Sequence, residues 1–127
     1  MSTFQKRKTS REVKIFGQRY LVDFGRDNIP SVFKQVQEGI EKIQQEEASY
    51  LGQAHFDVKI NREKELLKKA IGEIILSSEM VETMFDDEDT LVLHRDIYAF
   101  LVEEYIEVMS KKSPYDIERI EGHKSFD

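Results

Sequence analysis

The chain has 127 residues, of which 39% are hydrophobic and 35% are charged, enough for one folded domain and too few for two full cores. It contains no cysteine, which excludes disulfides, zinc–thiolate sites and thiol nucleophiles. No apolar run approaches the roughly 18 residues of a membrane span, and the first ten residues lack the apolar core of a signal peptide. The redox compartment stays open, although a reducing cytosol is compatible with the lack of cysteine, and we do not expect the protein to contact a membrane.

The charge is unevenly distributed along the chain, whose net charge is −6. Residues 1–28 hold seven basic residues against three acidic ones, whereas residues 29–112 hold ten against eighteen. The acidic part would repel phosphate, so we do not expect nucleic-acid binding. We interpret residues 1–10 as a flexible basic tail, 11–112 as a single α-rich domain and 113–127 as a polar C-terminal tail.

The first predicted element is a β-hairpin. Apolar and polar residues alternate from Val13 to Phe24 around the pair Gly17 and Gln18. Glycine at the first central position of a two-residue loop predicts a type II′ turn. Because two strands alone are marginally stable in water, the hairpin has to pack on a helix or pair with strands of another subunit.

Apolar residues at spacings of three and four predict two amphipathic helices after the hairpin. The first helix starts at a cap at Asn28 or Ser31, and the second runs from a cap at Asn61 to about Phe85. Residues 52–60, which lie between them, could form either a short strand or an ordered loop.

A third helix is predicted over residues 91–112, with Asp89 as its N-cap and an apolar surface around about half of its circumference. A helix with so wide an apolar surface is either central in its own domain or buried by a neighbouring molecule. The predicted fold class is α+β, mainly α, with an N-terminal β-hairpin followed by three main helices.

The sequence shows no catalytic, cofactor or metal site. Its histidines, His55, His94 and His123, have no second ligand at helical spacing, and phosphate-binding glycine motifs and the nucleophile elbow of hydrolases are absent. The contiguous acidic stretch at 86–89 lacks the alternate spacing and the glycine of a calcium loop. We therefore expect a protein that binds rather than catalyses and needs no cofactor, with His94 at the surface or at a helix start.

Three apolar residues, Leu76, Met80 and Phe100, fall outside the stripes that would pack the core. Leu76 and Met80 are four residues apart on the far side of the second predicted helix, where they would stack together. Phe100 extends the apolar arc of the third helix. We predict these three as partner-binding residues; the alternative is that they pack within a dimer or against the hairpin.

Over about residues 12–112 the order of elements resembles that of small tail assembly chaperones of siphophages and related prophages. The resemblance is carried by a Gln/Glu/Lys-rich helix after the hairpin and by three segments, VKIFGQRYLVDF at 13–24, MFD at 84–86 and IYAFL at 97–101. One departure is the acidic stretch at 86–89, which stands where such proteins have a turn with a glycine.

The resemblance implies a non-catalytic morphogenesis protein in the cytoplasm of a bacterial host. Such chaperones keep the long tape measure protein soluble until tail tube subunits assemble around it, so either of these proteins is the implied partner. Homo-oligomerisation is compatible with this role. Two alternatives remain open: a small acidic phage protein that binds and inhibits or regulates a host protein, and a structural subunit of the particle that self-assembles through the hairpin edge.

Overall fold

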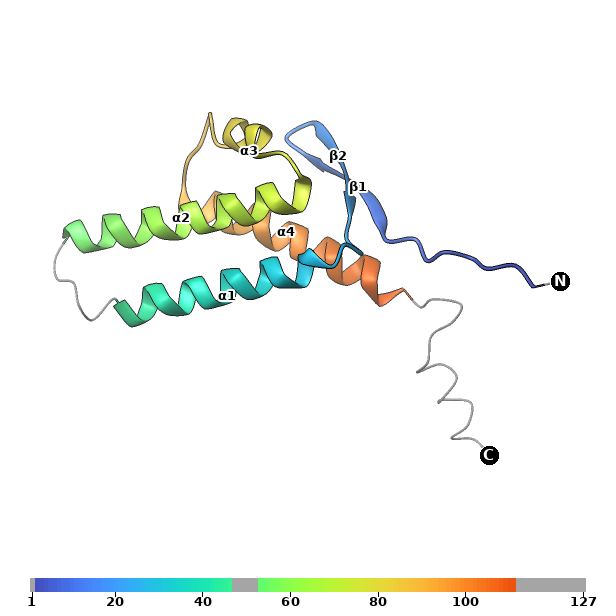
Figure 1. Ribbon diagram of the computed structural model, residues 1–127. Helices are drawn as coiled ribbons and strands as arrows, with labels where there is room; N and C mark the ends of the chain where they lie inside the picture. Colours follow the sequence, from blue (N-terminus) through green and yellow to red (C-terminus); the bar gives the residue numbers. More distant parts are fainter. Residues whose placement is uncertain (1, 47–52, 112–127) are drawn as a thin grey trace.

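The computed structural model describes residues 2–46 and 53–111, without the side chains of residues 53–55. The described chain forms an N-terminal hairpin and four helices (Figure 1), which are β1 (Ser10–Ile15), β2 (Gln18–Asp23), α1 (Asn28–Glu46), α2 (Gln53–Ile75), α3 (Ser78–Met84) and α4 (Leu91–Ser110). The fold class is α+β, mainly α, as predicted. None of the helices in these ranges has the length and apolar character needed to cross a bilayer. The predicted C-terminal tail lies outside the described residues.

The turn of the hairpin differs from the predicted one. Ile15 pairs with Gln18, which leaves Phe16 and Gly17 as the two loop residues. Their φ angles of +49° and +80° are both left-handed, which is the signature of a type I′ turn. The type II′ prediction is wrong because it placed the glycine first, whereas Phe16 takes the first left-handed position.

The inner face of the hairpin packs on helices of the same chain, so the requirement for a packing partner is met. β2 contacts α2, and β1 contacts α4. Arg11 lies on this inner face and binds two carboxylates of α4, those of Glu104 at 2.8 Å and Glu107 at 3.1 Å. The apolar residues of the face are buried, as the alternation predicts: Val13, Ile15, Tyr20 and Val22.

α2 is the central helix of the domain, because α1, α3, α4 and β2 all contact it. Leu67, Ile71 and Ile74 of α2 are at most 1% exposed. Burying an aliphatic side chain of this size stabilises the fold by about 1.5–3 kcal/mol. The core therefore forms around α2. It also includes Phe24, which follows β2, and Leu101 of α4.

The second predicted helix has different boundaries. α2 begins at Gln53, so neither a strand nor a loop occupies the described part of residues 52–60, and Asn61 lies inside the helix rather than at its cap. The helix also ends at Ile75, because a separate short helix, α3, follows it. The apolar periodicity continues across this break, since three later residues join the same core: Val81, Met84 and Phe85.

The break between α2 and α3 is a Schellman motif. Leu76 has a left-handed φ of +58°, and the Ser77 N–H donates to the Gly72 carbonyl oxygen at 3.2 Å. The Ser77 hydroxyl then caps α3 by accepting a hydrogen bond from the Met80 N–H. Because the helix stops here, the predicted stacking of Leu76 and Met80 on one helix face is wrong.

α4 closely follows its predicted range, but its N-cap is Thr90 rather than Asp89. The Thr90 hydroxyl accepts a hydrogen bond from the Leu93 N–H at 3.2 Å. At the other end of α4, the Arg7 guanidinium donates to the carbonyl oxygens of Met109 and, at 2.7 Å, Lys111. These carbonyls have no partner within the helix, so Arg7 joins the N-terminal segment to the last helix.

Leu76→Gly should stabilise the protein. A left-handed backbone costs a non-glycine residue about 1–2 kcal/mol, whereas glycine adopts it freely but loses about 0.5–1 kcal/mol more chain entropy on folding. We expect a net gain of about 0.5–1 kcal/mol and a rise of a few degrees in Tm, measured by circular dichroism. Leu76→Ala is the control, because it removes the exposed side chain and keeps the strained Cβ. Equal stabilisation by both substitutions would show that backbone strain is not the cause.

Candidate functional site

An open apolar groove lies between α1 and α4. Both helices pack against α2, and they run in opposite directions (Figure 1). The groove has a volume of about 550 Å³. Two of its lining residues are polar and the others are apolar: Phe33, Val36, Gln37, Ile40, Glu41, Tyr98, Val102, Tyr105 and Ile106. A concave apolar surface along two helices is a typical docking site for a third helix.

Aromatic rings of α1 and α4 contact one another in the lining of the groove. The Phe33 ring of α1 meets two rings of α4 edge to face, Tyr105 with ring centroids 4.9 Å apart and Tyr98 at 6.1 Å. Tyr105 also meets Phe24 at 6.4 Å. Such edge-to-face contacts are favourable and hold the rings in a fixed orientation. Burial raises the pKa of the Tyr98 hydroxyl above its ordinary value.

The walls of the groove leave apolar surface in water. Ile40 and Val102 are half-buried, and Ile106 is 58% exposed. Exposed apolar surface carries a free-energy cost of about 25 cal/mol per Å², which a docked apolar side chain would remove. The groove is therefore suited to bind an apolar surface, and Ile106 would gain the most burial.

The predicted partner-binding residues lie elsewhere. Leu76 is 71% exposed and lines a hollow of about 610 Å³ between α2 and α3, beside charged residues such as Lys68 and Glu82. Met80 and Phe100 are half-buried and pack against the core. The structure brings Leu76 and Met80 to the α2–α3 junction, leaves Phe100 on α4, and places none of the three in the lining of the α1–α4 groove.

The sequence did carry a signal for the groove. The wide apolar surface predicted for the third helix includes its four α4 residues, and the apolar stripe of the first helix includes Phe33 and Ile40. Periodicity leaves open whether the wide surface of the third helix is core or contacts a neighbouring molecule, because it shows which residues share a face and not what covers that face. The arrangement of α1 and α4 around α2 is needed to tell which residues of these stripes line the groove and which belong to the core.

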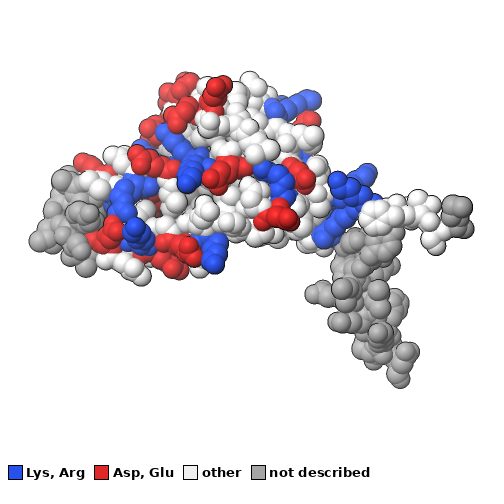
Figure 2. Space-filling model, in the orientation of Figure 1, with Lys and Arg blue, Asp and Glu red and all other residues white. Residues whose placement is uncertain are grey.

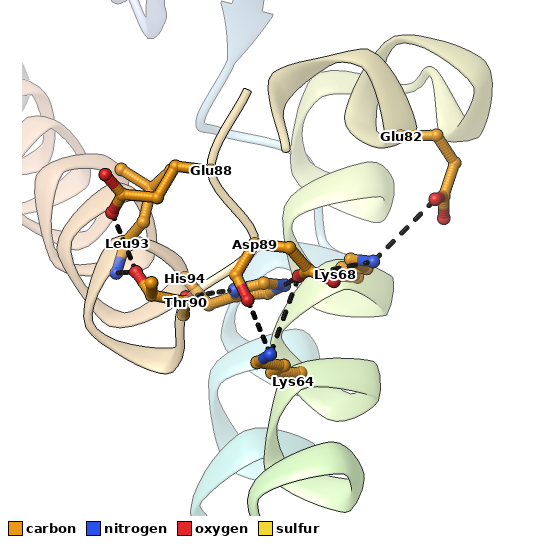
Figure 3. Close-up of polar contacts among 8 residues, drawn as sticks. All are labelled: Lys64, Lys68, Glu82, Glu88, Asp89, Thr90, Leu93 and His94. Atoms are coloured by element: carbon orange, nitrogen blue, oxygen red, sulfur yellow. Dashed lines mark hydrogen bonds and ion pairs between the residues drawn. The ribbon is translucent and has the colours of Figure 1, made fainter. Parts of the chain in front are cut away.

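A second candidate is the polar cluster where α4 begins (Figure 3). Of the two positions expected for His94, the helix start is confirmed and the surface is wrong, because its side chain is fully buried in the first turn of α4. The ring stacks on Phe85 with centroids 3.8 Å apart. Its Nδ1 lies 2.6 Å from the Thr90 carbonyl oxygen, to which it donates, and its Nε2 lies 3.5 Å from Oδ1 of Asp89.

Two lysines of α2 neutralise Asp89 in this cluster. Lys64 and Lys68 place their Nζ atoms 3.8 Å and 3.9 Å from Oδ1 of Asp89, and Lys68 also lies 3.7 Å from a Glu82 carboxylate oxygen. No group of three metal-ligating side chains occurs within residues 2–46 and 53–111. A substrate cannot reach the fully buried His94 ring. The cluster therefore joins α2, α3 and the start of α4 structurally.

Acidification below pH 6.5 should destabilise the protein through His94. Burial lowers its pKa below the ordinary value of 6.5, and the two lysines lower it further, against the opposing effects of the Thr90 carbonyl and Asp89. The unfolded chain therefore takes up the proton first as the pH falls, and the free energy of unfolding decreases until the folded-state pKa is reached.

We expect the free energy of unfolding in urea to fall between about pH 7 and about pH 5.5, and to fall less steeply in the variant His94→Gln. Other carboxylates and histidines contribute to both proteins, so the difference between the two slopes isolates His94. Equal slopes would assign the pH dependence to other groups.

Comparisons of the chain with protein-family models, with curated proteins and with solved structures found no match. The functional assignment therefore depends on the geometry of the α1–α4 groove and on the resemblance in element order described above. Of the two candidate sites, the groove is the one that a partner can reach.

Proposed function

We propose that this protein is a non-catalytic binding protein that holds an apolar helix of another protein in the α1–α4 groove. The observation that carries the proposal is the open groove of about 550 Å³ with its nearly continuous apolar lining. The tail assembly chaperones that this chain resembles in element order bind the phage tape measure protein, and we propose this protein as the first partner to test. Binding in such a groove needs no cofactor.

The spacing of the lining residues favours a helical client. Phe33, Val36 and Ile40 of α1 follow one another at intervals of three and four residues, and Tyr98, Val102 and Tyr105 of α4 do the same. These intervals form the ridges that interdigitate when helices pack side by side. An amphipathic client helix with apolar residues at the same intervals would fill the groove between the two ridges.

The charge in the groove lining favours a client helix with a basic residue. The charged residue among the lining residues is Glu41. Exposed pairs of opposite charge add little affinity, but they raise association rates and disfavour acidic competitors. We therefore expect affinity to come from the apolar contact and selectivity from Glu41.

Co-expression with a tape measure protein tests the proposal. We expect the tape measure protein to become soluble and to co-purify with this chain. Ile106→Asp should weaken the complex at least tenfold, because it places a carboxylate against the apolar face of the client. Val92→Asp is the matched control, since Val92 is also an exposed apolar residue of α4, at 64%, and lies outside the groove lining.

Salt separates this function from that of a charge-driven inhibitor. At about 1 M salt the Debye length falls to about 3 Å, so a complex held by surface charges dissociates while a complex held by apolar contacts persists.

Two outcomes would contradict parts of the proposal. Equal losses of affinity in Ile106→Asp and Val92→Asp would show that the groove is not the binding site. If the tape measure protein stays insoluble but an unrelated amphipathic peptide binds, and Ile106→Asp abolishes that binding, the groove is a binding site and the tape measure protein is not its client.

A further inference from the structure

The hairpin has an exposed edge that the groove does not explain. The sheet consists of β1 and β2 alone among the described residues, so each strand has a neighbour on one side. Leu21, in the middle of β2, is 76% exposed, although Tyr20 and Val22 beside it are buried. An unpaired strand edge that carries an exposed apolar residue is a recognised site for the addition of another strand.

The ladder shows which backbone groups this edge offers. The Phe24 N–H donates to the Thr9 carbonyl oxygen at 3.0 Å, which makes these two residues a hydrogen-bonded pair. Hydrogen-bonded and non-hydrogen-bonded pairs alternate along an antiparallel ladder. Leu21, which lies opposite Glu12, is therefore in a non-hydrogen-bonded pair, and its N–H and C=O point away from β1.

The same alternation turns the N–H and C=O of Arg19 and the N–H of Asp23 outward. The Asp23 carbonyl already accepts hydrogen bonds from the Arg26 backbone N–H at 3.4 Å and from its side-chain Nε at 3.1 Å. The side chains of Arg19, Leu21 and Asp23 all lie on the outer face of the hairpin, since residues at alternate positions share a face. The edge thus presents a basic, an apolar and an acidic residue in that order.

We propose that β2 pairs antiparallel with β2 of a second copy of this chain, with the two-fold axis at Leu21. In this register Leu21 packs against Leu21 of the second copy, and the two exchange backbone hydrogen bonds. Arg19 lies opposite Asp23 of the second copy, and this pair occurs twice because the interface is symmetric. Each Asp23 N–H donates to the opposite Arg19 carbonyl, and opposite charges directly across two strands stabilise the pairing.

Other registers between the two β2 strands lose this pairing of apolar and oppositely charged side chains. A shift that centres the pairing on Arg19 places like charges opposite each other, and a shift by a single residue turns the buried face of the strand outward. The β1 edge presents Ser10, Glu12 and Lys14 on the same outer face, so pairing there would bury no apolar side chain.

The charged side chains are available for the new pairs. Arg19 is 71% exposed and bound only loosely, at 3.5 Å, to an exposed Glu12. Oδ1 of Asp23 accepts hydrogen bonds from the Thr9 hydroxyl at 2.6 Å and from the Gly25 N–H at 3.0 Å. These bonds fix the carboxylate and lower its pKa, so Asp23 stays charged and its second oxygen can accept from the arginine of the second copy.

A cysteine at the axis tests the register. The chain contains no cysteine, so Leu21→Cys adds a single thiol. Directly opposed residues in a hydrogen-bonded antiparallel pair have Cα atoms about 5.5 Å apart, within the disulfide range of about 4.4–6.8 Å. Mild oxidation should convert Leu21→Cys to a covalent dimer. Glu12→Cys is the matched control, because it lies opposite Leu21 on the same outer face but on the other strand, and it should stay monomeric.

Sedimentation of the cysteine-free protein supplies the second measurement. We expect a monomer–dimer equilibrium whose Kd becomes at least tenfold weaker in Leu21→Lys, since the two lysines would meet at the axis. Circular dichroism of this variant should be unchanged because Leu21 is exposed. Cross-linking of Leu21→Cys no faster than Glu12→Cys would overturn the proposal. So would a monomeric protein at about 1 mM, or a dimer that Leu21→Lys leaves intact.

Discussion

The central position of α2 is the constraint on which the rest of the structure depends. Its buried side chains need neighbours on several sides, and α1, α3, α4 and β2 supply them. The outer helices α1 and α4 both pack on α2, and they meet each other through the rings of Phe33, Tyr98 and Tyr105. The open groove between α1 and α4 follows from this arrangement, because no further element of the described chain lies over the side of the two helices that faces away from α2.

Polar contacts fix how the outer elements sit on α2. Arg95 of α4 holds the nearly buried carboxylate of Glu63 on α2 through two hydrogen bonds, at 2.5 Å and 3.0 Å. Arg26, after β2, donates to the carbonyl oxygens of Glu73 and Ile74 at the end of α2. The Arg95–Glu63 ion pair specifies the orientation of α4 on α2 more than it adds stability. The position of α4 beside α1, and with it the shape of the groove, depends on such contacts.

Periodicity predicted the elements whose one face is buried, namely the strands of the hairpin, α1 and α4, because burial of one face imposes a repeat on the sequence. It did not predict the end of α2, since Leu76 occupies a left-handed position where glycine is the usual signal and the apolar stripe resumes in α3. Two of the three residues predicted for binding, Leu76 and Met80, depended on that uninterrupted helix. The groove combines faces from two helices far apart in the sequence, so Ile106 could not be distinguished from core.

The contact between Arg7 and the end of α4 joins residues 102 positions apart, and Arg11 reaches Glu104 over 93 positions. During synthesis the hairpin leaves the ribosome before both helices that cover its inner face, α2 and α4. The part of this face that packs on α4 therefore stays uncovered until α4 has emerged, so the domain completes its folding late. In a nascent chain, the hairpin is the segment that most needs protection from wrong pairing.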